Sequence, residues 1–169
     1  HVAANYDFAS DNGFWQCVST FCNKYSSFES RPQWHFTRND FYAKRTAAFD
    51  EFARSRHTCR HYVKGAVIPD DTIRQVVELS QTAPSACNRQ HVRVHCVSNP
   101  ILKEQVRNLQ GGNRGFGQFA DKFLVITSDI SDLRWAAERY DLYTNAGVFV
   151  MNLCYALHFY EIAHCILHW

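Results

Sequence analysis

The feature of this sequence that most limits its fold is a long region near the C-terminal end with apolar residues at helical spacing. The region begins near Ser131, and its helically spaced positions are Leu133, Ala136, Tyr140, Tyr143, Gly147, Val150, Cys154 and Leu157. After Asp141 it is apolar on nearly all sides, and a helix of that kind is covered by neighbours on most of its surface. We therefore expect a long, largely buried helix, at the core or at a subunit interface. Asn152 and His158 interrupt its richest part, so it does not predict a membrane span.

Length and composition indicate one globular domain. The 169 residues are enough for one core, and 46% hydrophobic against 20% charged residues is typical of a compact protein. The formal net charge of +2 gives no reason to expect a nucleic-acid or membrane partner. Seven cysteines without a CxxC pair predict free thiols in a reducing compartment. Because no targeting peptide is recognisable, we expect a cytoplasmic protein.

Capping residues and periodicity predict the remaining elements. We expect helices that begin near residues 11–12, 39–40, 69 and 99, and strands at residues 92–96 and 123–127. The second of these helices is expected to run unbroken to the polar residues 54–58. Residues 111–117 hold four of the seven glycines and predict a mobile surface loop.

The first candidate for chemistry is the run Arg56-His57-Thr58-Cys59-Arg60. In an extended segment alternate side chains point the same way, so Arg56, Thr58 and Arg60 can converge on one anion. The forked donors of arginine match phosphate oxygens. The alternative is a solvated basic turn, which the run taken alone favours.

The second candidate is the polar loop of residues 83–90, which reads Ala-Pro-Ser-Ala-Cys-Asn-Arg-Gln. Its Ser85, Asn88 and Gln90 offer the donors and acceptors that can bind the edge of a planar heterocycle. An ordinary connection made of turn-forming residues is the alternative.

In combination, Arg-His-Thr-x-Arg followed after one helix by A-P-S-x-x-N-R-Q resembles the nitroreductase family of flavoenzymes. Members carry an Arg-Arg-Ser-x-Arg type segment and then P-S-x-x-N-x-Q-P-W. The resemblance covers roughly residues 52 to 169. It implies an α+β fold with a small mixed, mainly antiparallel sheet and helices on both faces. On this basis we expect a helical extension at residues 1–50 and an FMN-binding domain at 51–169, with part of the domain missing at its C-terminal side.

The resemblance also implies roles for individual residues. Those expected at the FMN phosphate and ribityl chain are Arg56, His57, Thr58 and Arg60, and those expected at the isoalloxazine ring are Pro84, Ser85, Asn88 and Gln90. The implied activity is hydride transfer from NADH or NADPH, through FMN, to a small-molecule acceptor such as a nitroaromatic or a quinone. Because the flavin carries this chemistry, no protein residue is predicted to be catalytic. A homodimer that builds each site from both subunits is also implied.

Two departures from the family pattern leave alternatives open. Cys87 stands where a glycine is usual, and His91-Val92 replace the usual Pro-Trp. Other redox tasks known in the family, namely reductive dehalogenation, flavin fragmentation and azoline oxidation, therefore stay open. An alternative from a different class is a flavin-free, non-catalytic interaction module or an inactive fragment of the same fold.

The C-terminal residues offer one further constellation, which could be drawn as a metal site: Cys154, His158, His164, Cys165 and His168. Its spacing matches no standard zinc module, and cysteine is a common core residue. We therefore expect buried thiols and hydrogen-bonded imidazoles here, and no metal.

Overall fold

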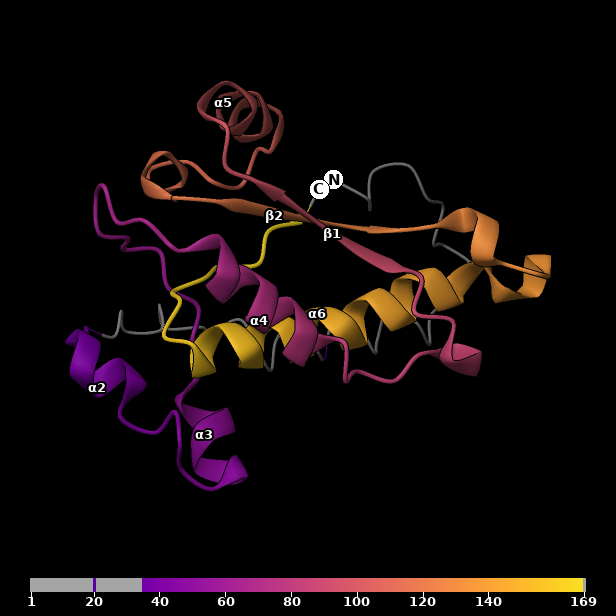
Figure 1. The fold of residues 1–169 in the computed structure, drawn as a ribbon, viewed down its shortest axis with the longest axis horizontal. Helices are drawn as coiled ribbons and strands as arrows, with labels where there is room; N and C mark the ends of the chain where they lie inside the picture. Colours follow the sequence, from indigo (N-terminus) through magenta and orange to yellow (C-terminus); the bar gives the residue numbers. More distant parts are fainter. Residues whose placement is uncertain (1–19, 21–34, 169) are drawn as a thin grey trace. The chain divides into compact units, whose positions relative to one another are not determined.

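The computed structural model describes residue 20 and residues 35–168. The chain divides into two units, His1–His35 and Phe36–Trp169, and the helices and strands labelled in Figure 1 belong to the second unit. The helix expected near residues 11–12 lies outside the described residues. The expected boundary between an extension and a domain at residue 50 stays a prediction.

Helices dominate the second unit, with two strands between them (Figure 1). The elements in chain order are α2 (Arg38–Tyr42), α3 (Phe49–Ser55), α4 (Asp70–Ser80), η2 (Ala86–Asn88), β1 (Val92–Val97), α5 (Pro100–Leu109), η3 (Gly117–Phe119), β2 (Phe123–Ser128), η4 (Ile130–Asp132), η5 (Ala136–Tyr140) and α6 (Asp141–Phe159), where η marks a short 3-10 helix. Across the part of the chain that the structure describes, no helix has the length and apolar character needed to cross a membrane.

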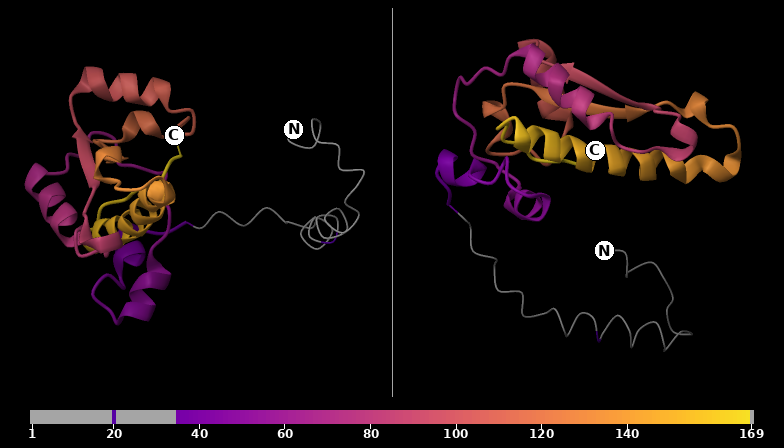
Figure 2. Two further views of the ribbon diagram at one scale, coloured as in Figure 1. Left: turned by 90° about the vertical axis from the view of Figure 1, so that its right-hand side faces the viewer. Right: turned by 60° about the horizontal axis from the view of Figure 1, so that its bottom comes forward.

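The two strands form an antiparallel sheet. Their register pairs Val92 with Ser128 at one end and Val97 with Phe123 at the other. Helices α4 and α6 lie on one side of the strands and α5 on the other, as Figures 1 and 2 show. This is the expected α+β arrangement with helices on both faces, and both described strands are antiparallel.

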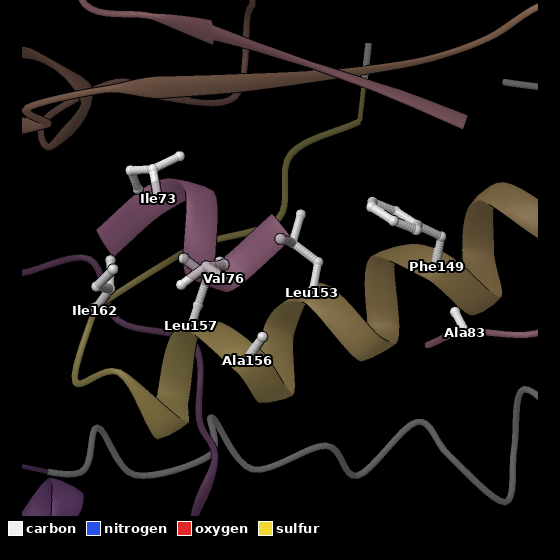
Figure 3. Close-up of a cluster of buried hydrophobic side chains, with 8 residues drawn as sticks. All are labelled: Ile73, Val76, Ala83, Phe149, Leu153, Ala156, Leu157 and Ile162. Atoms are coloured by element: carbon white, nitrogen blue, oxygen red, sulfur yellow. The ribbon is translucent and has the colours of Figure 1, made fainter. Parts of the chain in front are cut away.

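The hydrophobic core lies where α4 packs on α6 (Figure 3). Val76 of α4 is fully buried, and Leu153 and Leu157 of α6 are 4% and 6% exposed. The buried residues of α4 recur at helical spacing and form one face, at Ile73, Val76 and Ser80. Asp70 in its first turn complements the positive end of the helix, which explains why the helix begins there.

The prediction of a single helix after residue 39 is wrong, because the chain forms two short helices, α2 and α3, with a turn between them. Thr37 caps α2. The rings of Phe41 and Phe52 both contact His158, at centroid distances of 5.5 and 5.4 Å. Eleven residues of continuous helix would separate these two rings by about 16 Å. The break therefore lets two distant aromatic side chains pack on one imidazole.

The long helix near the C-terminal end begins later than expected, at Asp141 instead of near Ser131. The Glu138 carboxylate accepts hydrogen bonds from the backbone N–H groups of Arg134 and Trp135, at 2.8 and 3.4 Å. These local bonds favour short turns over a continuous helix. The residues before α6 therefore form η4 and η5.

The glycine-rich segment of residues 111–117 is packed and not simply a surface loop. Asn113 is 3% exposed, and its Nδ2 donates to the Arg107 carbonyl at 2.8 Å. The Gly117 N–H donates to the Asn113 carbonyl at 2.9 Å, and a Cβ added to Gly117 would lie 2.6 Å from Asn113 Oδ1. The glycine at this position thus permits close packing.

Candidate functional site

The segment Arg56–Arg60 follows α3 directly and lies against the C-terminal end of α6. The Ser55 hydroxyl lies 3.0 Å from His158 Nε2 on α6. Farther along, the Cys59 N–H donates to the His164 carbonyl at 3.0 Å. These two contacts fix the start and the middle of the segment.

The cations of this segment have no carboxylate partner within residues 35–168. Arg56 is half-buried, and its Nε is buried without a hydrogen-bond partner among the described residues. Thr58 and Arg60 are exposed, and the Arg60 guanidinium lies 6.0 Å from the Phe116 ring centroid. His57 is also exposed. A partly buried cation without a counter-charge is unfavourable, so this segment is suited to receive an anion from outside.

The loop of residues 84–90 is a compact turn with left-handed backbone conformations. Cys87, Asn88 and Gln90 have φ values of 52°, 53° and 50°. Such values are unfavourable for residues with side chains and recur at binding sites, where the surrounding structure holds them. A left-handed residue at position 87 gives a physical reason for the usual glycine in the family motif.

Hydrogen bonds within the loop hold this conformation. The Ser85 carbonyl accepts from the Asn88 N–H at 2.9 Å, and the Ser85 hydroxyl accepts from the Gln90 N–H at 3.0 Å. Gln90 Nε2 donates to Asn88 Oδ1 at 2.9 Å. Asn88 is exposed, and its Nδ2 makes no hydrogen bond to the described residues. Pro84, also exposed, precedes the turn. The loop thus presents the amide of Asn88 to the outside.

Helix α6 anchors this loop through Asn145, which is 8% exposed. Its Oδ1 accepts from the Ala86 N–H at 3.3 Å, and its Nδ2 lies 2.9 Å from His91 Nε2. Since an amide Nδ2 can only donate, His91 Nε2 accepts this hydrogen bond. Asn145 therefore links α6 to both ends of the turn.

A second anchor is the ion pair between Arg89 and Glu138, which sequence reasoning did not identify. Both guanidinium NH2 groups donate to the carboxylate at 2.7 Å, in the bidentate geometry typical of strong pairs. The hydrogen bonds from Arg89, followed by the backbone N–H of Arg134, lower the pKa of Glu138 to about 2. Forty-nine residues separate the partners, and no local pattern links them.

The eight predicted site residues fall into two groups at opposite ends of α6. Arg56, His57, Thr58 and Arg60 lie at the end marked by His158, whereas the loop of residues 84–90 contacts Asn145. At 1.5 Å per residue these two positions of α6 are about 20 Å apart. Figure 1 shows α3 at one end of α6, while the chain between α4 and β1, which contains η2, passes the other end. One copy of the chain therefore does not bring the two groups together.

Between these ends, α6 carries an exposed apolar face that the fold of residues 36–168 does not cover. Tyr143, Val148 and Met151 are 77%, 41% and 38% exposed, and Tyr140, just before the helix, is 62% exposed. Gly147 lies in the middle of this face, and a Cβ added there would meet nothing within 4 Å. The packing within one chain thus gives no reason for a glycine at this helical position, which costs about 1 kcal/mol relative to alanine.

The sequence model of the nitroreductase family matches residues 53–152, which is more than half of the chain. The chain belongs to the nitroreductase family. The matched residues include both groups described above. No curated protein matches the sequence.

Solved structures share this fold at low sequence identity. A protein described as a nitroreductase from Desulfovibrio desulfuricans, in complex with FMN, is 19% identical, with a TM-score of 0.55 over 64% of this chain and 60% of that one. A second FMN complex, from Exiguobacterium sibiricum, is 15% identical, with a TM-score of 0.62 over 68% and 71%. A protein from Staphylococcus epidermidis described as an NAD(P)H:FMN oxidoreductase is 18% identical, with a TM-score of 0.55 over 63% and 67%. The present chain spans about three fifths of the length of the Desulfovibrio protein.

The two groups have the chemistry that FMN requires. A phosphate needs charge-assisted donors, which the exposed Thr58 hydroxyl and two arginines without a carboxylate partner among residues 35–168, Arg56 and Arg60, offer. The polar edge of a flavin ring needs amide donors, which Asn88 presents. Within the described part of the chain, no cluster of three or more His, Cys, Asp or Glu side chains is arranged to hold a metal ion.

Proposed function

We propose that this protein is an FMN-dependent oxidoreductase that takes hydride from NADH or NADPH and reduces an acceptor such as a nitroaromatic or a quinone. The observation that carries the proposal is that one nitroreductase fold presents two features: arginines on the segment Arg56–Arg60 that have no carboxylate partner among residues 35–168, and the outward-facing amide of Asn88. When bound, FMN supplies the hydride chemistry. The protein binds and orients it.

In this proposal the arginine segment binds the phosphate. Arg56 and Arg60 donate charge-assisted hydrogen bonds, each contributing about 1.5 to 3 kcal/mol when well formed. Thr58 adds a hydroxyl donor, and His57 lies beside them. The loop with Pro84, Ser85, Asn88 and Gln90 lies along the ring, where its hydrogen bonds to Asn145 and Glu138, the latter through Arg89, keep it rigid.

We further propose that the working unit is a homodimer formed through the exposed face of α6. A two-fold axis pairs the same surface of both copies. If the two α6 helices run antiparallel, the C-terminal end of one lies beside the N-terminal end of the other. The arginine segment of one copy then approaches the partner's Asn88, and the separation of about 20 Å along α6 no longer divides the site. Gly147 would let the two helix backbones approach closely.

The visible absorption spectrum of the purified chain tests the proposal. The protein is incubated with FMN, desalted, and then mixed with NADPH or NADH without oxygen. Flavin bands that stay with the protein and bleach on addition of the nicotinamide support the oxidoreductase. A folded protein that retains no flavin contradicts it and favours the flavin-free, non-catalytic alternative.

Two variants test the assigned residues. Arg56→Ala and Asn88→Ala are expected to weaken FMN binding by tenfold or more, since each removes one or more well-formed hydrogen bonds of about 1.5 kcal/mol. Matched controls are Arg74→Ala on α4 and Asn108→Ala on α5, which change exposed residues that belong to neither group. Equal FMN affinity in the site variants and their controls would show that the residues are wrongly assigned.

A further inference from the structure

His158 is a buried imidazole at the junction between α6 and the two short helices that precede the arginine segment. Its exposed fraction is 0%. The rings of Phe41, Tyr42 and Phe52 surround it, with centroids 5.5, 5.3 and 5.4 Å from its own. Helices α2 and α3 therefore both pack on this side chain, and α3 also contacts Tyr155 of α6 through Phe49 and Phe52, at centroid distances of 5.7 and 5.5 Å.

The hydrogen bonds of Ser55 define the tautomer of His158. The Ser55 hydroxyl donates its only proton to the Phe52 carbonyl at 2.8 Å. It must therefore accept from His158 Nε2–H, which lies 3.0 Å away. The other ring nitrogen, Nδ1, then carries no proton, and it is buried without a hydrogen-bond partner among the described residues.

The surroundings of His158 offer no counter-charge for a second proton. The titratable or charged groups that act on it or lie beside it on the packed elements are Tyr42, Cys154, Arg56, His57, Glu161 and His164. Burial foremost, and then His164, Arg56 and His57, lower its pKa to about 4. Glu161, the only carboxylate among these groups, already pairs with Arg38 at 2.6 Å and Arg45 at 2.7 Å. A proton at Nδ1 would thus be a buried cation without an acceptor.

We infer that His158 is a positioning residue for the phosphate-binding segment, which it holds in place while neutral and releases when protonated. The inference rests on the proposed function. Neutral His158 binds Ser55 and so fixes the residue next to Arg56. When a proton from solvent adds to Nδ1, the buried cation becomes solvated only if α2 and α3 move away and admit water. The arginine segment then loses its support, and FMN dissociates more readily.

The size of the effect follows from the two protonation equilibria. With a pKa near 6.5 in the open form and about 4 in the closed form, acidification from pH 7.5 to pH 5 favours the open form by about 30-fold. The FMN affinity is expected to fall by up to this factor, which is reached when the FMN-free chain is mostly in the open form. The neutral imidazole of His158 therefore stabilises the closed form above pH 6.5, and this stabilisation is lost as the pH falls toward 4.

Release of FMN between pH 7.5 and pH 5, measured by flavin fluorescence in an ultrafiltrate, tests the inference. His158→Gln keeps an amide donor for Ser55 but does not titrate, so its flavin affinity should fall less than that of the wild type over this range, by the part that comes from the phosphate of FMN alone. His95→Gln is the matched control, since His95 is an exposed histidine bound to Thr127 on the sheet. The control should keep the pH dependence of the wild-type protein. Equal pH dependence in all three proteins would overturn the inference.

Hydrogen exchange of the wild-type chain gives a second readout that does not need flavin or the variant. Corrected for intrinsic rates, exchange of residues 38–55 should rise about 30-fold between pH 7.5 and pH 5, while residues 92–97 of β1 stay protected. Equal loss of protection in both peptides, or in neither, contradicts a local release at His158. A chain that binds no FMN at pH 7.5 but shows this local opening contradicts the proposed function and leaves the role of His158 supported.

Discussion

Replacement of Gly147 by leucine is expected to have opposite effects on the stability of one copy and on the assembly of two. A Cβ at this position meets nothing within 4 Å in the single chain. Leucine is a much better helix former than glycine, so Gly147→Leu should raise the free energy of unfolding of the monomer by roughly 0.8 kcal/mol. For a unit of this size the gain corresponds to an increase in Tm of about 3 °C.

The same substitution is expected to abolish the dimer and to reduce flavin retention. Packed helices are separated by about 8 to 10 Å, and a glycine at the crossing permits the shorter distance. A leucine side chain there would push the partner helix away. Light scattering after gel filtration gives the mass, and absorbance at the flavin bands gives the occupancy.

Gly111→Leu is the control for this experiment, because that glycine also has open space around its Cβ and lies far from α6 in sequence. It should leave both mass and flavin content unchanged. A Gly147→Leu protein that stays dimeric with full flavin content would refute the assignment of this face as the interface. A wild-type chain that is monomeric yet binds FMN would refute the composite site.

Three further substitutions, the first with a matched control, test the local structure. Cys87→Gly relieves a left-handed conformation and should stabilise the protein by about 1 kcal/mol in urea unfolding, whereas Cys96→Gly on β1 should not. Val76→Ala removes two methyl groups from a fully buried site and should cost about 2 kcal/mol in the same assay. The lowered pKa of Glu138 means that its pairing with Arg89 stabilises the fold above pH 4.5 and that this stabilisation is lost as the pH falls toward 2. Glu138→Gln should remove that pH dependence from thermal unfolding curves.

Elements governed by local signals could be predicted from the sequence. Asn99 caps α5 through hydrogen bonds to the N–H groups of Ile101 and Leu102, as its position before Pro100 indicates. The alternation in residues 92–96 correctly predicted β1. The division into α2 and α3 could not be predicted, because it depends on a contact with His158, more than a hundred residues away.

The candidate site shows the same limit. The identity of the residues in both groups could be predicted, because each motif is a short continuous run. Their distance could not, because it depends on where α3 and the loop of residues 84–90 dock along α6. The anchors Glu138 and Asn145 act from other elements, so their roles follow only from tertiary contacts.

The length of α6 between Asn145 and His158 acts as a fixed spacer in both distance and angle. Each inserted or deleted residue would shift one end by 1.5 Å and rotate it by about 100° relative to the other. One inserted residue would thus turn either the contact with Ala86 or the contact with Ser55 away from its partner. Length changes within this helix should therefore be far less tolerated than changes in the exposed turn around Gly65, and engineered variants of the protein are best made there.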